Sequence, residues 1–143
     1  MPALAALFIF IGILLGAGLG CDDATGPEPP PIGGAFQLVE FEGEPLPVTI
    51  ASNGPGCFQQ VTHGFLTLEP DFRVFQMEYQ THDSCDGRML SLVESIGVYG
   101  QDGQRIDFTE PAVPEGRPDI VYDGVINGER IVVDFLGVEL VFE

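Results

Sequence analysis

The feature that most restricts the fold of this chain is a repeated alternation of apolar and polar residues between positions 35 and 143. In residues 75–79 and 105–109, for example, every second side chain is apolar. Successive side chains of a strand point to opposite faces, so this period of two predicts strands with one face in a core. No helical period recurs in this part of the chain. The pattern therefore predicts an all-β domain.

Turn-forming sequences divide the alternating runs into about eight strands. The predicted strands are residues 35–41, 65–68, 75–79, 89–99, 105–109, 120–126, 131–135 and 138–142. Between two of them, Asn127-Gly128 favours a type I′ turn. Consecutive hairpins that each have one apolar face are expected to close into a single antiparallel up-and-down β-barrel, because closure removes exposed edges. A β-sandwich is the alternative.

The N-terminal segment is a different kind of sequence. Residues 2–20 are uncharged and rich in Leu, Ile, Phe and Ala, and they predict a hydrophobic signal helix. The stretch Gly18-Leu19-Gly20-Cys21 resembles a bacterial lipobox, which implies that Cys21 is acylated and becomes the mature N-terminus. An uncleaved membrane anchor and an ordinary secretory signal remain the alternatives. All three interpretations place the rest of the chain outside the cytoplasm.

These patterns divide the chain into three parts. Residues 1–20 are predicted to be a signal peptide, and residues 21–33 a tether that begins at the lipidated Cys21. The proline run at positions 29–31 favours an extended spacer, and the glycines at 33 and 34 end it. Residues 34–143 are predicted to form the barrel. The expected location is the bacterial cell envelope, with the domain held on a membrane and facing the periplasm or the cell surface.

The three cysteines agree with export. If Cys21 carries lipid, Cys57 and Cys85 remain as a pair in an oxidising compartment, and we expect a disulfide between them. Two buried free thiols are the alternative. A zinc site is a weaker interpretation, because no pair of histidines accompanies the two cysteines.

The domain also resembles the small exported bacterial lipocalin-like domains. Those domains open with Gly-x-Trp or Gly-x-aromatic and end in a short apolar strand; here Gly34-Ala35-Phe36 and Leu140-Val141-Phe142 hold these positions. The resemblance implies a barrel whose interior holds a small apolar ligand. The residues that would line it are Phe36, Leu38, Phe75, Met77, Tyr79, Phe108, Phe135 and Phe142. A packed core is the competing interpretation of these side chains, and Phe65 is counted among them as an inward-facing aromatic.

The charge of the chain limits its partners. There are 22 acidic residues against five arginines and no lysine, which gives a formal net charge of −17. Nucleic acid requires clustered cations, so it is excluded as a partner. A basic protein would be attracted, and small disulfide-bearing barrel lipoproteins that inhibit lysozyme are a precedent. The second functional hypothesis is therefore an acidic protein-binding module or inhibitor.

No catalytic or metal site can be assembled from the sequence. His82, Asp83 and Ser84 are too close in one predicted loop to converge as a catalytic triad, and they suit a surface turn. His63 is expected to face solvent. Asp83 and Asp86 lack the length and the closing glutamate of a calcium loop. We expect a non-enzymatic protein that needs no cofactor.

Overall fold

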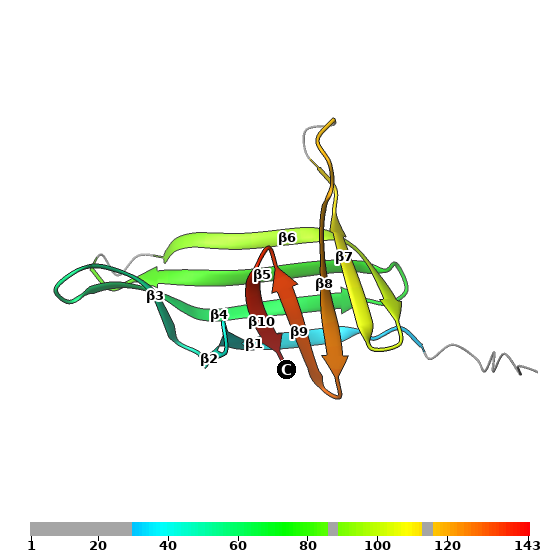
Figure 1. Ribbon diagram of the computed structural model, residues 1–143, viewed down its shortest axis with the longest axis horizontal. Helices are drawn as coiled ribbons and strands as arrows, with labels where there is room; N and C mark the ends of the chain where they lie inside the picture. The colour runs from blue at the N-terminus through cyan, green and yellow to red at the C-terminus, as the bar shows by residue number, and fades with distance from the viewer. Residues whose placement is uncertain (1–29, 86–88, 113–115) are drawn as a thin grey trace, which may run out of the picture.

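The computed structural model describes residues 30–85, 89–112 and 116–143, and it contains ten antiparallel strands (Figure 1). They are β1 (Gly34–Phe41), β2 (Glu44–Pro45), β3 (Val48–Gly54), β4 (Cys57–Glu69), β5 (Val74–Asp83), β6 (Met89–Asp102), β7 (Arg105–Glu110), β8 (Ile120–Asn127), β9 (Arg130–Phe135) and β10 (Val138–Phe142). Within the described residues, no helix is long and apolar enough to cross a membrane.

Eight of the strands close into a barrel. Each strand from β4 to β10 pairs with the next one along the chain, and β1 pairs with both β10 and β4. The predicted antiparallel up-and-down barrel is therefore confirmed. β2 and β3 are additional strands, attached to β1 and β4 respectively. Closure pairs Gly34 with Leu68 on one side of β1 and Phe41 with Leu140 on the other.

Strands β4, β5 and β6 are longer than the barrel needs. Their distal parts, together with β3, form an extension that runs past the barrel on the left of Figure 1. The predicted disulfide between Cys57 and Cys85 is present at its end, with the two Cα atoms 5.1 Å apart. It connects the first residue of β4 to the turn after β5.

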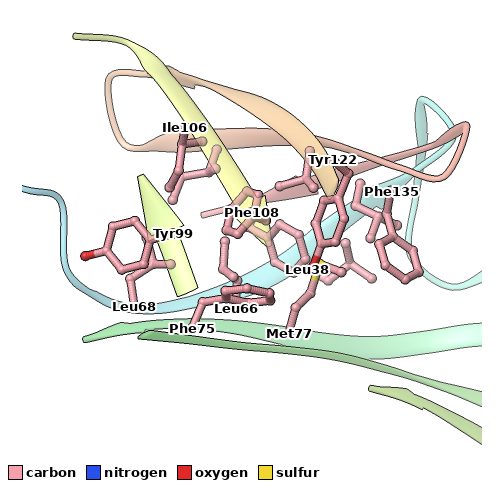
Figure 2. Packing of buried hydrophobic residues seen from close by; sticks show 14 of the residues in the cluster. Leu38, Leu66, Leu68, Phe75, Met77, Tyr99, Ile106, Phe108, Tyr122 and Phe135 are labelled. Atoms are coloured by element: carbon pink, nitrogen blue, oxygen red, sulfur yellow. The ribbon is translucent and has the colours of Figure 1, made fainter. Parts of the chain in front are cut away.

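The core is built from alternate residues of the barrel strands. Their side chains lie between β4 and β5 on one side and β7 to β9 on the other, as Figure 2 shows. The largest fully buried side chains include Phe75, Phe108 and Phe142. Thus the period of two that predicted the strands also fixes which face of each strand is inside.

The chain enters the barrel at the end where β4 turns into β5. Ile32 is held there by two hydrogen bonds: its N–H donates to Gln101 Oε1, and the Tyr99 hydroxyl donates to its carbonyl oxygen, both at 2.7 Å. Gly33 follows against the ring of Pro70, with no room for a Cβ. The residues that the sequence assigns to the end of the tether therefore belong to the folded domain.

Several details of the sequence prediction are wrong. Phe65 is on the outer face of β4 and is 39% exposed. His82 belongs to β5 rather than to a loop. Asn127 pairs with Arg130, so the central residues of the β8–β9 turn are Gly128 and Glu129. Gly128 alone of these two has a positive φ, at 66°, whereas the expected type I′ turn needs it at both central residues.

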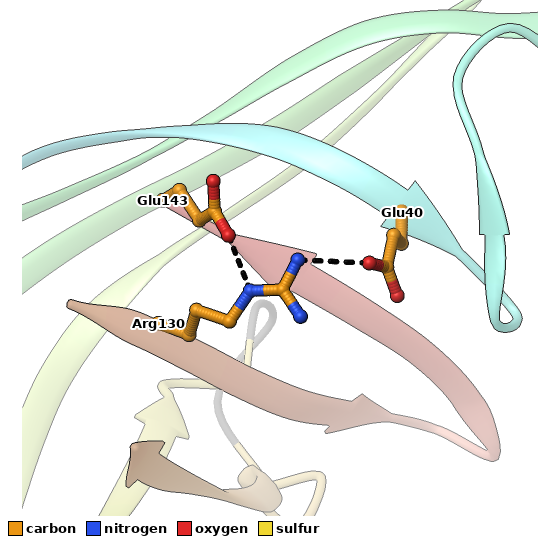
Figure 3. A network of polar contacts seen from close by, with 3 residues as sticks. All are labelled: Glu40, Arg130 and Glu143. Atoms are coloured by element: carbon orange, nitrogen blue, oxygen red, sulfur yellow. Dashed lines mark hydrogen bonds and ion pairs between the residues drawn. The ribbon is translucent and has the colours of Figure 1, made fainter. Parts of the chain in front are cut away.

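The alternation in residues 138–143 predicts that Val141 points outward together with Glu139 and Glu143, yet Val141 is buried. Its neighbours across the strands are Val132 and Glu40. The guanidinium of Arg130 crosses β10 to bond Glu143 and, at 2.9 Å, Glu40 (Figure 3). The bonds to these two carboxylates, that to Glu143 above all, raise the pKa of Arg130. The aliphatic stem of an arginine commonly covers apolar surface, so Arg130, in bridging Glu143 and Glu40 across β10, is placed to shield this part of the strand.

Candidate functional site

The interior of the barrel is occupied by a cluster of aromatic rings. The Phe108 ring lies 4.9 Å from that of Phe75 and 5.2 Å from that of Tyr122, centroid to centroid, and the Tyr122 ring lies 5.0 Å from that of Phe135. Such edge-to-face and stacked contacts are typical of a well-packed core. The strands β5, β7, β8 and β9 thus meet through direct ring contacts at the centre of the barrel.

The structure brings together the eight side chains proposed as ligand contacts. Six of them are buried: Leu38, Phe75, Met77, Phe108, Phe135 and Phe142. Phe36 and Tyr79 are half-buried and pack against the same cluster. An eight-stranded barrel is just wide enough for its own side chains to fill. These positions therefore form the hydrophobic core of the barrel.

A polar group is buried beside this core. The Ser95 hydroxyl donates to Glu110 Oε2 at 2.6 Å, and the Tyr122 hydroxyl lies 2.8 Å from Ser95 Oγ, to which it donates. Burial, chiefly, and the nearby Glu110 carboxylate raise the pKa of Tyr122 above its ordinary value. Each hydroxyl has a partner, so this group satisfies buried polar atoms and connects the middle of β6 to the end of β7 and the start of β8.

A cleft of about 370 Å³ opens beside Glu110. Its lining residues lie at the end of β7 and the start of β8: Glu110, Pro111, Ala112, Arg117, Pro118 and Ile120. One carboxylate and one guanidinium therefore border a mainly apolar surface. This cleft therefore has the chemistry to hold a small amphipathic molecule.

The outer face carries a row of acids that the sequence does not reveal. Asp107 pairs with Asp123, Asp123 with Asp134, and Asp134 with Glu139, so four carboxylates lie side by side across β7, β8, β9 and β10. We call these four residues the acidic row. Arg105 bonds Asp107 at 3.0 Å and lies 4.0 Å from Asp123. Within the described chain, neither Asp134 nor Glu139 forms an ion pair.

Valines line one side of the acidic row. Val125 pairs with Val132, and Val132 with Val141, two residues along each strand from the acids. A shallow cleft of about 210 Å³ lies over this region, lined by Asp123, Asp134 and Glu139 together with Val125, Val132 and two glycines. This surface combines a carboxylate array with an aliphatic floor, and it can take a cation attached to an aliphatic chain.

The two histidines are not brought into a site. His63 is exposed on β4, where its Nδ1 lies 3.0 Å from Thr62 Oγ1. Asp83 Oδ1 accepts the Cys85 N–H at 2.8 Å, and the Ser84 hydroxyl accepts the Phe58 N–H. The Asp83–Cys85 bond is a local turn contact, as expected for this segment, whereas the Phe58–Ser84 bond connects the turn to β4. Among the described residues, no group of three His, Cys, Asp or Glu side chains could hold a metal ion.

Three features of the sequence prediction lie outside the described residues. They are the signal peptide at residues 1–20, the lipidated Cys21, and the tether as far as position 29. The structure describes the final residues of the tether segment, from Pro30 onward.

Comparison with known proteins gives no relative for this chain: no protein-family model, no curated protein and no solved structure matches it.

Proposed function

We propose that this protein is a non-enzymatic lipoprotein of the bacterial cell envelope that binds a basic partner protein on the outer face of β7 to β10. The lipobox-like sequence before Cys21 supports the anchor. The Cys57–Cys85 disulfide supports an oxidising compartment. The observation that carries the binding function is the acidic row.

Like charges directly opposite one another destabilise a sheet. Asp123 faces Asp107 on one side and Asp134 on the other. Arg105 compensates the charge of Asp107 and Asp123 only. A fold that needed these residues only for solubility would have no reason to align them. A cationic partner would remove the repulsion on binding, and a chain of net charge −17 would also steer it from a distance.

The valines beside the acidic row favour a partner that offers arginine or lysine. Val125 is 44% exposed and forms the floor of the shallow cleft with Val132. The aliphatic stem of a basic side chain would lie on these valines while its charged head reached the carboxylates of Asp123 and Asp134. A small inorganic cation would gain nothing from the valines.

The alternative function is binding of a small apolar ligand. The ring contacts of the interior give it no support, because Phe75, Phe108 and Tyr122 already occupy the centre of the barrel. The cleft beside Glu110 and Arg117 is the place that favours it most. Protein binding is the hypothesis that the geometry supports better.

Neutralising the centre of the acidic row is expected to weaken binding of a basic protein. With lysozyme as the probe, Asp123→Asn/Asp134→Asn should raise Kd by about tenfold at low salt, since two charge contacts are lost. Asparagine keeps an oxygen for the bond that Asp134 accepts from the Gly137 N–H at 2.8 Å. Removing like charges should also raise Tm slightly. Titration calorimetry at two salt concentrations measures the first effect.

The matched control is Glu69→Gln/Asp71→Asn, which removes the same charge from exposed positions at the β4–β5 turn. It should change Kd by about twofold or less at the higher salt concentration, near 0.15 M, where exposed charges more than about 8 Å apart are largely screened. An equal loss in both variants would mean that net charge, rather than this face, attracts the partner. Wild-type binding that does not respond to salt would also contradict the proposal.

The proposed anchor is tested at the mature N-terminus. Intact-mass and peptide mass spectrometry of the full chain from a bacterial host should find Cys21 as the first residue, carrying diacylglycerol. Cys21→Ser should abolish the modification and move the protein out of the membrane fraction. A mature chain that begins with an unmodified Cys21, or elsewhere, would refute the lipoprotein assignment.

A further inference from the structure

Barrel closure leaves part of β6 without a neighbour. β6 pairs with β5 from Met89 to Val98, but its pairing with β7 covers only Val98 to Asp102. Among the strands that the structure describes, residues 92–96 therefore have a paired strand on the β5 side alone. Closure of the barrel was expected to remove such edges, and here it does so only for the C-terminal part of β6, from Val98 to Asp102.

The direction of the backbone groups on this edge follows from one hydrogen bond. The Tyr99 N–H donates to the Arg73 carbonyl at 2.8 Å, on the β5 side. The N–H and C=O of one residue point to the same side of an antiparallel strand, and successive residues alternate. The N–H and C=O groups of Leu92, Glu94 and Ile96 therefore point to the open side.

The edge is open because β7 leaves β6 abruptly. At Gly97 the two strands are so close that a Cβ would overlap the carbonyl oxygen of Thr109. Just beyond this contact β7 ends at Glu110, and Pro111 follows with no N–H to continue the ladder. A cleft of about 320 Å³ separates the diverging segments, and it is lined by Glu94, Ile96, Glu110 and Pro111.

This edge has little of the usual protection against strand addition, because Glu94 is the only charged residue among residues 92–96. Natural edge strands are commonly short or carry lysine, proline or a bulge. The chain has no lysine, and the pairing of β6 with β5 is regular from Ser91 to Val98. Leu92 and Ile96 are 49% and 54% exposed, so two large apolar side chains flank the open backbone groups.

We propose that the open edge of β6 is a strand-addition site for an extended segment of a partner protein. The segment would pair with the backbone of Leu92, Glu94 and Ile96 and place β-branched side chains beside the two exposed apolar residues. Glu94 and Glu110 on either side of the cleft favour lysine or arginine within it. They disfavour a second copy of this chain, which would bring two Glu94 carboxylates together. This site is separate from the acidic row and does not depend on it.

The test uses a synthetic peptide and the full chain in detergent. The probe is an acetylated octapeptide that alternates valine and threonine and has lysine at both ends. Saturating peptide should slow amide hydrogen exchange at Leu92, Glu94 and Ile96 by at least about tenfold, measured by NMR. The amides of Val93 and Ser95 already face β5 and should change much less. Unchanged exchange at the three edge amides in the saturated complex would overturn the proposal.

Two matched controls isolate the backbone pairing. Two further peptides are N-methylated on alternate residues, one at the odd positions and the other at the even positions. The peptide whose methyl groups block the N–H groups that face β6 should lose affinity, and the other peptide should retain it. Ile96→Pro removes an edge N–H that the β5 ladder does not use, and it should weaken binding roughly fivefold, whereas Ile96→Thr should stay within about twofold. Equal affinity of all peptides would overturn strand addition. Edge protection that rises with protein concentration alone would instead identify a second copy as the occupant.

Discussion

Phe108→Ala is expected to lower the free energy of unfolding by about 3–5 kcal/mol. Phe108 is fully buried and contacts the rings of both Phe75 and Tyr122, so its removal leaves a cavity at the centre of the barrel. A loss of this size is a large fraction of the stability of a small domain. Because the chain has no tryptophan, urea unfolding is best followed by circular dichroism or tyrosine fluorescence.

Phe65→Ala is the matched control for this prediction. It removes the same side chain from the outer face of β4, where Phe65 is 39% exposed. The expected loss is about 1 kcal/mol or less, because little new buried surface is left without contacts. If both variants lost the same stability, the assignment of these two phenylalanines to opposite faces of the barrel would be wrong.

Removal of the disulfide is expected to have the next largest effect. The bridge joins residues 28 positions apart, and opening a loop of this length costs about 3–4 kcal/mol of stability in the chain-entropy model. Cys57→Ser/Cys85→Ser should therefore unfold at a lower urea concentration than the oxidised wild type. The measurement is a urea titration of both proteins with and without a thiol reductant.

Reductant provides an internal check. Reduced wild type should unfold like the double variant. The double variant should not respond to reductant, because its one remaining cysteine, Cys21, takes no part in the bridge. A wild type that keeps its unfolding midpoint in reductant, with the bridge shown to be open, would mean that the folded extension does not depend on the cross-link.

The barrel could be predicted from sequence because its strands carry the signal locally. In β7 and β9 every second residue is buried, and in β10 the observed bounds are the predicted ones. The extension could not be predicted in the same way. The described side chains of β3 and the first four residues of β4 (57–60) are half-buried or exposed, so they show no clear alternation. A register shift between Val61 and His63 further obscures the pattern.

The acidic row shows why a surface is harder to predict than a core. Alternation alone places Asp107, Asp123, Asp134 and Glu139 on outward positions, where their charge would be no more than a general property of the surface. Their alignment depends on the register of three successive hairpins, and each turn sets one register. The β8–β9 turn was misassigned by one residue, an error that would have moved Asp134 away from Asp123.

The contacts of Ile32 also fix the end of the barrel at which the N-terminal segment joins it. Ile32 is fixed to Tyr99 and Gln101 at one end of the barrel, and the disulfide-linked end of the extension points the other way (Figure 1). β4 alone has 13 residues, and at about 3.3 Å per residue it spans roughly 40 Å. With a lipid at Cys21, the extension would stand away from the bilayer, so that its tip would be the part of the protein that first meets a molecule approaching the membrane.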